Sequence, residues 1–256
     1  MNNALRSEWT KLRSLRSTWL TLLCTAAIGI GVGALIAHAR GRGYFEMTPE
    51  DRAAFDPTAS SLTSIIMAQL AIGVLGVLVM TSEYATGMIQ PSLTAVPRRG
   101  RLYAAKIVTF GATALVAGQV IGFVSFLAGQ ALIAGTGAPH TDLGEPGVLR
   151  GVVGCGLYLA VLGLLGLALG AMARATAGAL GLLVTITLLV RLLSTALPAG
   201  WQRWMGTYWP TTAGEKITTV IRVPDTLPPW AGFGLLCAFT AAMLLGGYVL
   251  LRSRDA

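Results

Sequence analysis

Six long apolar stretches alternate with polar segments along this chain of 256 residues. Each stretch has about the length that an α-helix needs to cross a bilayer, roughly 20 residues at about 1.5 Å each. The pattern predicts an all-α, polytopic membrane protein with one transmembrane domain over residues 1–256. The predicted spans are Trp19 to Ala37, Leu62 to Thr81, Ile107 to Ile133, Val152 to Ala173, Ala177 to Leu197 and Trp230 to Leu251.

Two features of the spans bear on their number and arrangement. The first run ends in Ala37-His38-Ala39, which resembles the cleavage site of a secretory signal peptide. That run is longer than the apolar core of a typical signal peptide, so we retain it as a span. Only a tight turn at Arg174 separates the fourth and fifth spans, which predicts an antiparallel hairpin.

The composition agrees with lipid as the main surroundings of the chain. Hydrophobic residues make up 54% of it and charged residues only 12%, whereas about a quarter of the residues in a soluble domain are charged. The net charge of +8 does not indicate nucleic-acid binding, because the basic residues are spread between the apolar runs. The three cysteines lie inside apolar runs and are expected to be small buried hydrophobes.

The charge distribution predicts the orientation, since short cytoplasmic loops are enriched in Lys and Arg. With the N-terminus inside, eleven Lys and Arg residues fall in cytoplasmic segments and seven in external ones. Three acids fall inside and eight outside. We therefore predict a multi-pass protein of the plasma membrane with both termini in the cytoplasm.

Residues 1–16 are predicted to form an interfacial helix. Apolar residues recur from Leu5 at spacings of four, three and three, which places them on one helical face opposite a basic face. Such a helix would lie along the cytoplasmic interface and contact anionic membrane lipid. The alternative is that its cations only anchor the chain inside the cell. The candidate residues are Trp9, Lys11, Leu12, Arg13, Leu15 and Arg16.

The cytoplasmic segment 82–104 is much longer than a turn requires. Ser82 can cap a helix that has Glu83 in its first turn, and apolar residues follow at helical spacing until Pro97. Pro91 must break or kink that helix. The pattern predicts a short helix lying across the cytoplasmic face.

The external segment 198–229 is rich in proline and aromatic residues, which gather at membrane interfaces. Because backbone at membrane depth must be helical or buried in protein, we expect one or two short helices there. The earlier external segment, His38 to Ala59, is acidic and polar and is expected to be a solvated connection.

The chain lacks the motifs of ATP hydrolysis and of metal chemistry. Its only lysines are Lys11, Lys106 and Lys216, and none stands in the GxxxxGK[ST] sequence that binds nucleotide phosphates. His38 and His140 stand alone, without the spacing of a metal site. We expect neither an enzyme active site nor a cofactor on this chain.

Polar side chains inside the spans are candidates for a substrate path. They are Gln69, Gln119, Gln130, Thr185, Thr187 and Arg191. Arg191 lies about six residues, roughly 9 Å, from the outer end of its span, so its guanidinium can reach the interface. It can also line a cavity or pair with an acid. The apolar runs contain no Asp or Glu, which argues against a proton relay.

Three spans carry two glycines four residues apart, a spacing that lets helix backbones approach closely. The pairs are Gly29 and Gly33, Gly118 and Gly122, and Gly166 and Gly170. The pattern leaves open whether the partner helix belongs to the same chain or to a second copy.

Together these features resemble the permease subunits of type-2 ABC transporters, particularly the stand-alone six-span form common in Gram-positive actinobacteria. The resemblance covers nearly the whole chain and rests on blocks in a fixed order. They are SEWTKLRSLRSTW at 7–19, EYATG at 83–87, AVPRRGR at 95–101 followed by Ala105 and Lys106, and WPTTAG at 209–214.

The resemblance implies that 1–16 is a connecting helix, that 82–104 holds a coupling helix that docks on a separate ATPase, and that 198–229 is a re-entrant helix pair. ATP and Mg²⁺ would bind that ATPase. Two permease copies and two ATPases would export hydrophobic or amphipathic substrates such as drugs, antibiotics, lipids or peptides. The coupling candidates are Glu83, Tyr84, Gly87, Met88, Ile89, Leu93, Arg98, Arg99 and Arg101.

Two alternatives stay open from the sequence. The chain could be an ATP-independent facilitator, or a membrane-embedded scaffold or sensor. The second permease copy could be identical or a paralogue. A neighbouring reading frame with a Walker A loop would favour the exporter.

Overall fold

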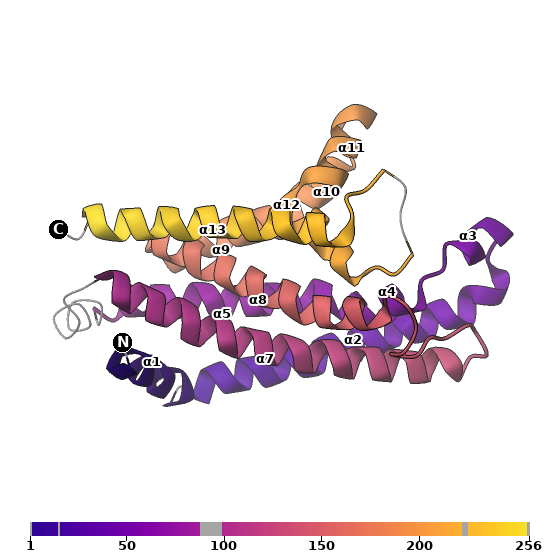
Figure 1. Ribbon diagram of the computed structural model, residues 1–256, viewed down its shortest axis with the longest axis horizontal. Helices are drawn as coiled ribbons and strands as arrows, with labels where there is room; N and C mark the ends of the chain where they lie inside the picture. The colour runs from indigo at the N-terminus through magenta and orange to yellow at the C-terminus, as the bar shows by residue number, and fades with distance from the viewer. Residues whose placement is uncertain (1, 15, 88–98, 222–224, 255–256) are drawn as a thin grey trace.

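The computed structural model describes residues 2–14, 16–87, 99–221 and 225–254, and helix is the only regular structure within them. The long helices run side by side as an elongated bundle (Figure 1). They are α2 (Arg16–Gly43), α5 (Ile65–Ala85), α7 (Arg99–Ala134), α8 (Val148–Ala173), α9 (Thr176–Val184) and α13 (Pro229–Arg254). A π-helical turn, Thr185–Leu189, joins α9 to α10 (Val190–Ser194).

Short helices lie at the ends of the bundle. They are α1 (Asn2–Ser14), η1 (Tyr44–Glu46), α3 (Pro49–Ala53), α4 (Pro57–Ser61), η2 (Leu62–Ser64), α11 (Ala199–Tyr208), α12 (Pro210–Glu215) and η4 (Lys216–Thr218). Both termini and the start of α7 lie at one end, here called the terminal end (Figure 1). The α3 helix lies at the other, distal end, and α11 projects from the side of the bundle.

Five helical segments in the described residues are long and apolar enough to cross a membrane. They are 57–85, 100–134, 148–173, 176–194 and 229–253. They coincide with the second to sixth predicted spans, which confirms a polytopic helical protein. The α2 helix covers the predicted first span over 28 residues, but many side chains in its first half lie outside the description. Six spans therefore remain a prediction.

The outer surface of the bundle is apolar, as lipid-facing helices require. Val116 on α7, Leu192 on α10 and Leu245 on α13 are each about two-thirds exposed. Such large exposed aliphatic side chains are unfavourable in water. This surface supports the prediction that the bundle lies in lipid.

The α8 helix forms the centre of the bundle and packs against α5, α7, α9 and α13. Its glycines permit these contacts, because a Cβ atom at Gly166 would lie 2.1 Å from the carbonyl oxygen of Gly73 on α5. A Cβ at Gly118 of α7 would lie 2.9 Å from the carbonyl of Gly156, and one at Gly33 of α2 would lie 2.8 Å from Ser64. The three glycine pairs thus serve packing within this chain.

The turn between α8 and α9 is as tight as predicted. Arg174 has a φ of 55°, in the left-handed region, and its N–H donates to the carbonyl of Gly170 as the last bond of α8. A left-handed residue at this position is a common way to end a helix. The two helices contact each other after the turn and form the predicted hairpin.

The external connection predicted as solvated is solvated only in part. The α2 helix continues to Gly43, and exposed residues follow from Phe45 to Ala54 apart from half-buried Met47. Pro57 and Thr58 are buried, since α4 packs against α2, α7 and α8. Asp56 caps α4 by accepting the N–H of Ala59. The second half of this connection therefore packs as part of the bundle.

Candidate functional site

Four charged side chains meet near the terminal end of the bundle, and we call them the lysine–glutamate cluster: Glu8 and Lys11 of α1, Glu83 of α5, and Lys106 of α7. The Lys106 Nζ atom lies 2.9 Å from Glu8 Oε2 and 2.7 Å from Glu83 Oε1. The Lys11 Nζ atom lies 2.7 Å from the same Glu83 oxygen and 3.1 Å from Glu8 Oε1. The cluster joins three helices that are far apart in the sequence.

The cluster is buried, and its two positive and two negative charges balance. Glu8, Glu83 and Lys106 are 3%, 6% and 2% exposed. Burying an ionised side chain is costly unless opposite charges and hydrogen bonds compensate for the lost water. Each charge here has two opposite partners, so removing one would leave another uncompensated.

Local structure presents these side chains to one another. Glu8 and Lys11 are three residues apart and therefore share one face of α1. Glu83 lies in the last turn of α5, and Lys106 lies about two turns into α7. The cluster thus brackets the connection between α5 and α7.

The environment of Lys11 favours its charged form. Burial by itself would lower the pKa of Lys11, but hydrogen bonds and attraction from Glu83 and Glu8 outweigh that effect and raise the pKa above 10.5. Lys11 is therefore a cation at physiological pH and holds α1 on the cluster.

Tyr84, the neighbour of Glu83, makes a second connection at the terminal end. The guanidinium of Arg174, in the turn between α8 and α9, lies 5.4 Å from the centre of the Tyr84 ring. Arg174 also donates to the carbonyl of Leu250 on α13, at 3.4 Å. Through Glu83 and Tyr84, the end of α5 is thus connected to α1, α7, α13 and the α8–α9 turn.

The structure separates the predicted coupling residues into three groups. Glu83 and Tyr84 are buried or half-buried, whereas Gly87 and Arg101 are exposed on either side of the connection. Gly87 has a φ of 69°, which favours glycine. Arg99 begins α7, and its side chain lies outside the description. Met88, Ile89, Leu93 and Arg98 also lie outside the described residues.

The predicted interfacial helix is present as α1, but its cations do not all face outward. Trp9 is 47% exposed, whereas Lys11 turns into the cluster. The side chains of Leu12, Arg13, Leu15 and Arg16 lie outside the description. Glu8 and Lys106 were not among the predicted site residues. The rarity of lysine and the single acid of the first fourteen residues were the signals available for them.

The three glutamines predicted for a substrate path form hydrogen bonds between helices. Gln69 accepts from the Tyr158 hydroxyl at 2.8 Å, and Gln119 donates to the carbonyl of Val153 at 3.1 Å. Gln130 donates to the carbonyl of Pro57 and accepts the N–H of Thr141. These contacts connect α5 and α7 to α8, and α7 to α4. The part of the glutamines in a substrate path stays a prediction.

The remaining path candidates lie around the π-helical turn between α9 and α10. Thr185 is exposed, and the hydroxyl of buried Thr187 donates to the carbonyl of Leu183. Arg191 forms an ion pair with Glu215 of α12. This pairing is one of the alternatives open from the sequence. The structure brings Thr185 and Arg191 to the surface of one helix and leaves the glutamines elsewhere.

The same π-helical turn holds the segment before the last span. The carbonyl of Ile186 accepts the indole N–H of Trp209 at 2.9 Å and the hydroxyl of Thr211 at 3.4 Å. The described part of this segment contains two short α-helices, α11 and α12, followed by the 3-10 helix η4, where one or two short helices were predicted. Their depth in a membrane remains a proposal.

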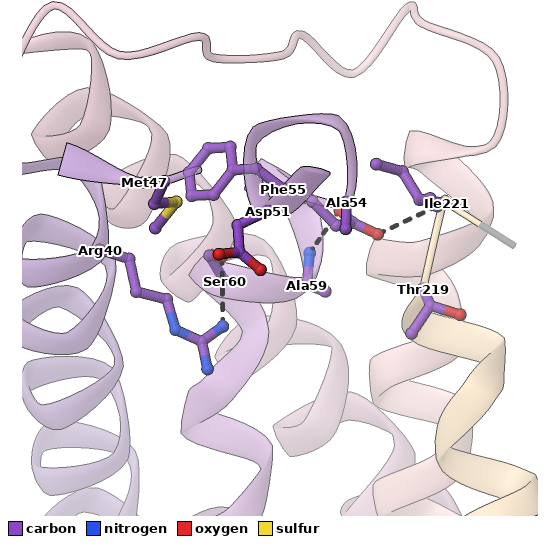
Figure 2. A pocket seen from close by; sticks show the side chains of 10 residues that line it. Arg40, Met47, Asp51, Ala54, Phe55, Ala59, Ser60, Thr219 and Ile221 are labelled. Atoms are coloured by element: carbon purple, nitrogen blue, oxygen red, sulfur yellow. Dashed lines mark hydrogen bonds between the residues drawn. The ribbon is translucent and has the colours of Figure 1, made fainter. Parts of the chain in front are cut away.

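A pocket of about 600 Å³ at the distal end is the other candidate site (Figure 2). Asp56, which borders it, accepts backbone N–H groups of Ala59, Val220 and Ile221. Arg40 points into the pocket and donates to the Ser60 hydroxyl at 3.3 Å. Asp56 therefore has a structural role, holding the backbone around Val220 next to α4. We place the candidate site at the lysine–glutamate cluster, because it joins three helices beside the α5–α7 connection.

Comparison with known proteins identifies a family over most of the chain. A family model described as "ABC-2 family transporter protein" matches residues 4–197, well over half of the chain. The matched range contains most of α1, the whole lysine–glutamate cluster and the long helices as far as α10. No curated protein matches the chain.

Proposed function

Because this chain belongs to the ABC-2 transporter family, we propose that it is the membrane-spanning permease subunit of an ATP-driven exporter, powered by a separate ATPase. The observation that carries the proposal is the structure around the α5–α7 connection. Its exposed flanks, Gly87 and Arg101, can contact a partner, while Glu83 and Tyr84 beside them are attached to the rest of the terminal end.

The ATPase is proposed to dock at the terminal end, on the segment 82–104 in the cytoplasm. ATP and Mg²⁺ would bind that subunit, since this chain carries no nucleotide-binding motif. Glu83 is buried, so its part in coupling is to position the connection and not to contact the ATPase directly. Arg101 is exposed and basic and is the better candidate for direct contact.

Movement of the connection would reach several helices at once. Displacing the end of α5 shifts Glu83 relative to Lys106 of α7 and Lys11 of α1. It also shifts Tyr84 relative to Arg174, between α8 and α9. Because ion pairs and packed rings are rigid over short distances, the terminal end is expected to move as one unit.

The substrate is proposed to pass along the face of α9 and α10, beside a second permease copy. These helices are the least buried of the five candidate spans, with 17% of their most apolar stretch buried inside the bundle. The exposed path candidates Thr185 and Arg191 lie on them, and the neighbouring exposed residues are apolar. Such a surface suits a hydrophobic or amphipathic substrate.

Co-purification with the ATPase encoded beside the permease tests the docking. Arg101→Glu is expected to reduce the amount of bound ATPase several-fold, because it reverses an exposed charge at the proposed contact. The matched control is Arg203→Glu, an exposed residue of α11, which should leave assembly unchanged. Equal assembly of both variants with the ATPase would contradict docking at the terminal end.

Transport by reconstituted vesicles tests the coupling. In vesicles that hold equal amounts of folded permease, Glu83→Gln is expected to retain the ATPase and its basal hydrolysis but to lose most substrate export, since the cluster would no longer hold the connection. Export that continues without any ATPase or ATP would instead support an ATP-independent facilitator.

A further inference from the structure

An apolar groove runs along the outside of the bundle between α1, α2 and α7. It has a volume of about 360 Å³, and its walls include Trp9 of α1, Leu23 and Ala26 of α2, and Ala112, Val116 and Ile121 of α7. From Ala112 to Ile121 the groove follows α7 for roughly 14 Å, at about 1.5 Å per residue. Its volume falls within the range of about 300–1,000 Å³ that is typical of ligand pockets.

The end of the groove at Trp9 is bordered by positive charge. Arg6 is exposed and lies three residues before Trp9, so the two side chains share one face of α1. Glu8 is the only acid of α1, and it is buried in the lysine–glutamate cluster. The exposed charge of α1 is therefore positive where the groove opens.

We propose that the groove binds one acyl chain of an anionic phospholipid, whose headgroup contacts Arg6 on α1. The apolar walls match the chain, and the cation at the mouth matches the phosphate. Trp9 marks the boundary between them, as tryptophan does where chains meet headgroups. This inference goes beyond the proposed export function and does not depend on it.

The dimensions favour a chain over a protein helix as the occupant. Two packed helices need about 8–10 Å between their axes, whereas α2 and α7 already contact each other beside the groove. A single flexible hydrocarbon chain fits such a slot. The bound lipid would contact both α1 and α7, the helices that carry Glu8 and Lys106, and would hold α1 on the bundle.

Native mass spectrometry of the purified full chain tests the proposal. Delipidated protein is titrated with phosphatidylglycerol or with phosphatidylcholine of the same chain length. The wild type is expected to retain one phosphatidylglycerol per chain at least several-fold more tightly than phosphatidylcholine. Ala112→Trp, which fills the groove from an exposed position, should lose this binding.

Two further variants separate the contribution of the apolar groove from that of the charged headgroup contact. Ala242→Trp makes the same change at an exposed position on α13 and should retain the lipid. Arg6→Gln should remove the preference for the anionic headgroup but keep binding of the chain.

Three results would overturn the proposal. They are equal lipid retention by the wild type and Ala112→Trp, equal loss in both tryptophan variants, and a change of oligomeric state in Ala112→Trp alone. The last result would show that a second copy of the chain covers the groove.

Discussion

Lys106 is a buried lysine that depends on two carboxylates to compensate for its lost contact with water. It is 2% exposed, and its ammonium group donates to the carboxylates of Glu8 and Glu83. A buried ammonium group without such partners would destabilise the fold. The pairing with Glu8 and Glu83 therefore compensates for the burial of Lys106 and fixes its place.

Neutralising one member of the cluster should be worse than neutralising two. Glu83→Gln leaves an excess positive charge in a buried place and is expected to cost about 3–5 kcal/mol of unfolding free energy. Adding Lys106→Met removes that excess and leaves Glu8 paired with Lys11. A double-mutant cycle from chemical unfolding in detergent measures the interaction. Simple additivity of the two single changes would contradict the cluster.

The contribution of Lys11 should depend on pH only in the alkaline range. Its folded pKa is raised above 10.5, so the folded state binds the proton more tightly than the unfolded state does. The stabilisation is then fully present below 10.5 and is lost as the pH rises through the folded pKa. The stability difference between wild type and Lys11→Gln, followed by thermal unfolding, should be constant near neutral pH and shrink above 10.5. A difference that shrinks toward acidic pH would contradict this assignment.

Among the elements, the π-helical turn between α9 and α10 connects the fifth predicted span to the segment before the sixth. Its carbonyl at Ile186 accepts two side-chain donors from the segment that starts α12. A π-helical turn changes the hydrogen-bond pattern of the helix from i→i+4 to i→i+5, and such turns are frequent at functional sites. The α12 helix in turn packs closely on α13.

The packing of α12 on α13 requires a glycine at one position. A Cβ atom at Gly232 would lie 2.2 Å from the carbonyl oxygen of Ala213, whereas one at Gly234 would meet nothing within 4 Å. Gly232→Ala is expected to lower stability by about 1–3 kcal/mol through overpacking. Gly234→Ala should be neutral or stabilising, because alanine favours helix over glycine. The measurement is the melting temperature of each variant in detergent. Equal values for the two variants would contradict the close packing of Gly232 against Ala213.

In the molecule as a whole, α1, the start of α7 and the end of α13 lie toward one end, while α3 lies at the other (Figure 1). A protein built in this way presents two different faces to the two sides of a membrane. The predicted orientation places the terminal end in the cytoplasm, where an ATPase has access to it.

Labelling of intact cells tests that orientation. In a variant whose three native cysteines are replaced, Gln202→Cys on α11 should react with an impermeant maleimide from outside. Arg101→Cys should react only after the cells are lysed. Both positions are exposed, so access and not burial decides the result. The reverse pattern would exclude docking of a cytoplasmic ATPase at the terminal end.

The sequence by itself determined the helical class, the approximate places of five long apolar helices, and the turn at Arg174. Apolar run length and turn residues are local properties, and a helix in lipid satisfies its own backbone hydrogen bonds. The spacing of the paired glycines likewise indicated which faces pack closely. It could not indicate which helix they meet.

Only the tertiary structure decided what the polar residues do. Glu8, Glu83 and Lys106 are separated by up to 98 positions, and no local pattern shows that they share one buried place. Gln69, Gln119 and Gln130 were candidates for a substrate path, and the structure adds that each forms a hydrogen bond with another helix. A polar group in an apolar surrounding takes its role from the partner that compensates for its lost water. That partner is set by the packing of helices far apart in the chain.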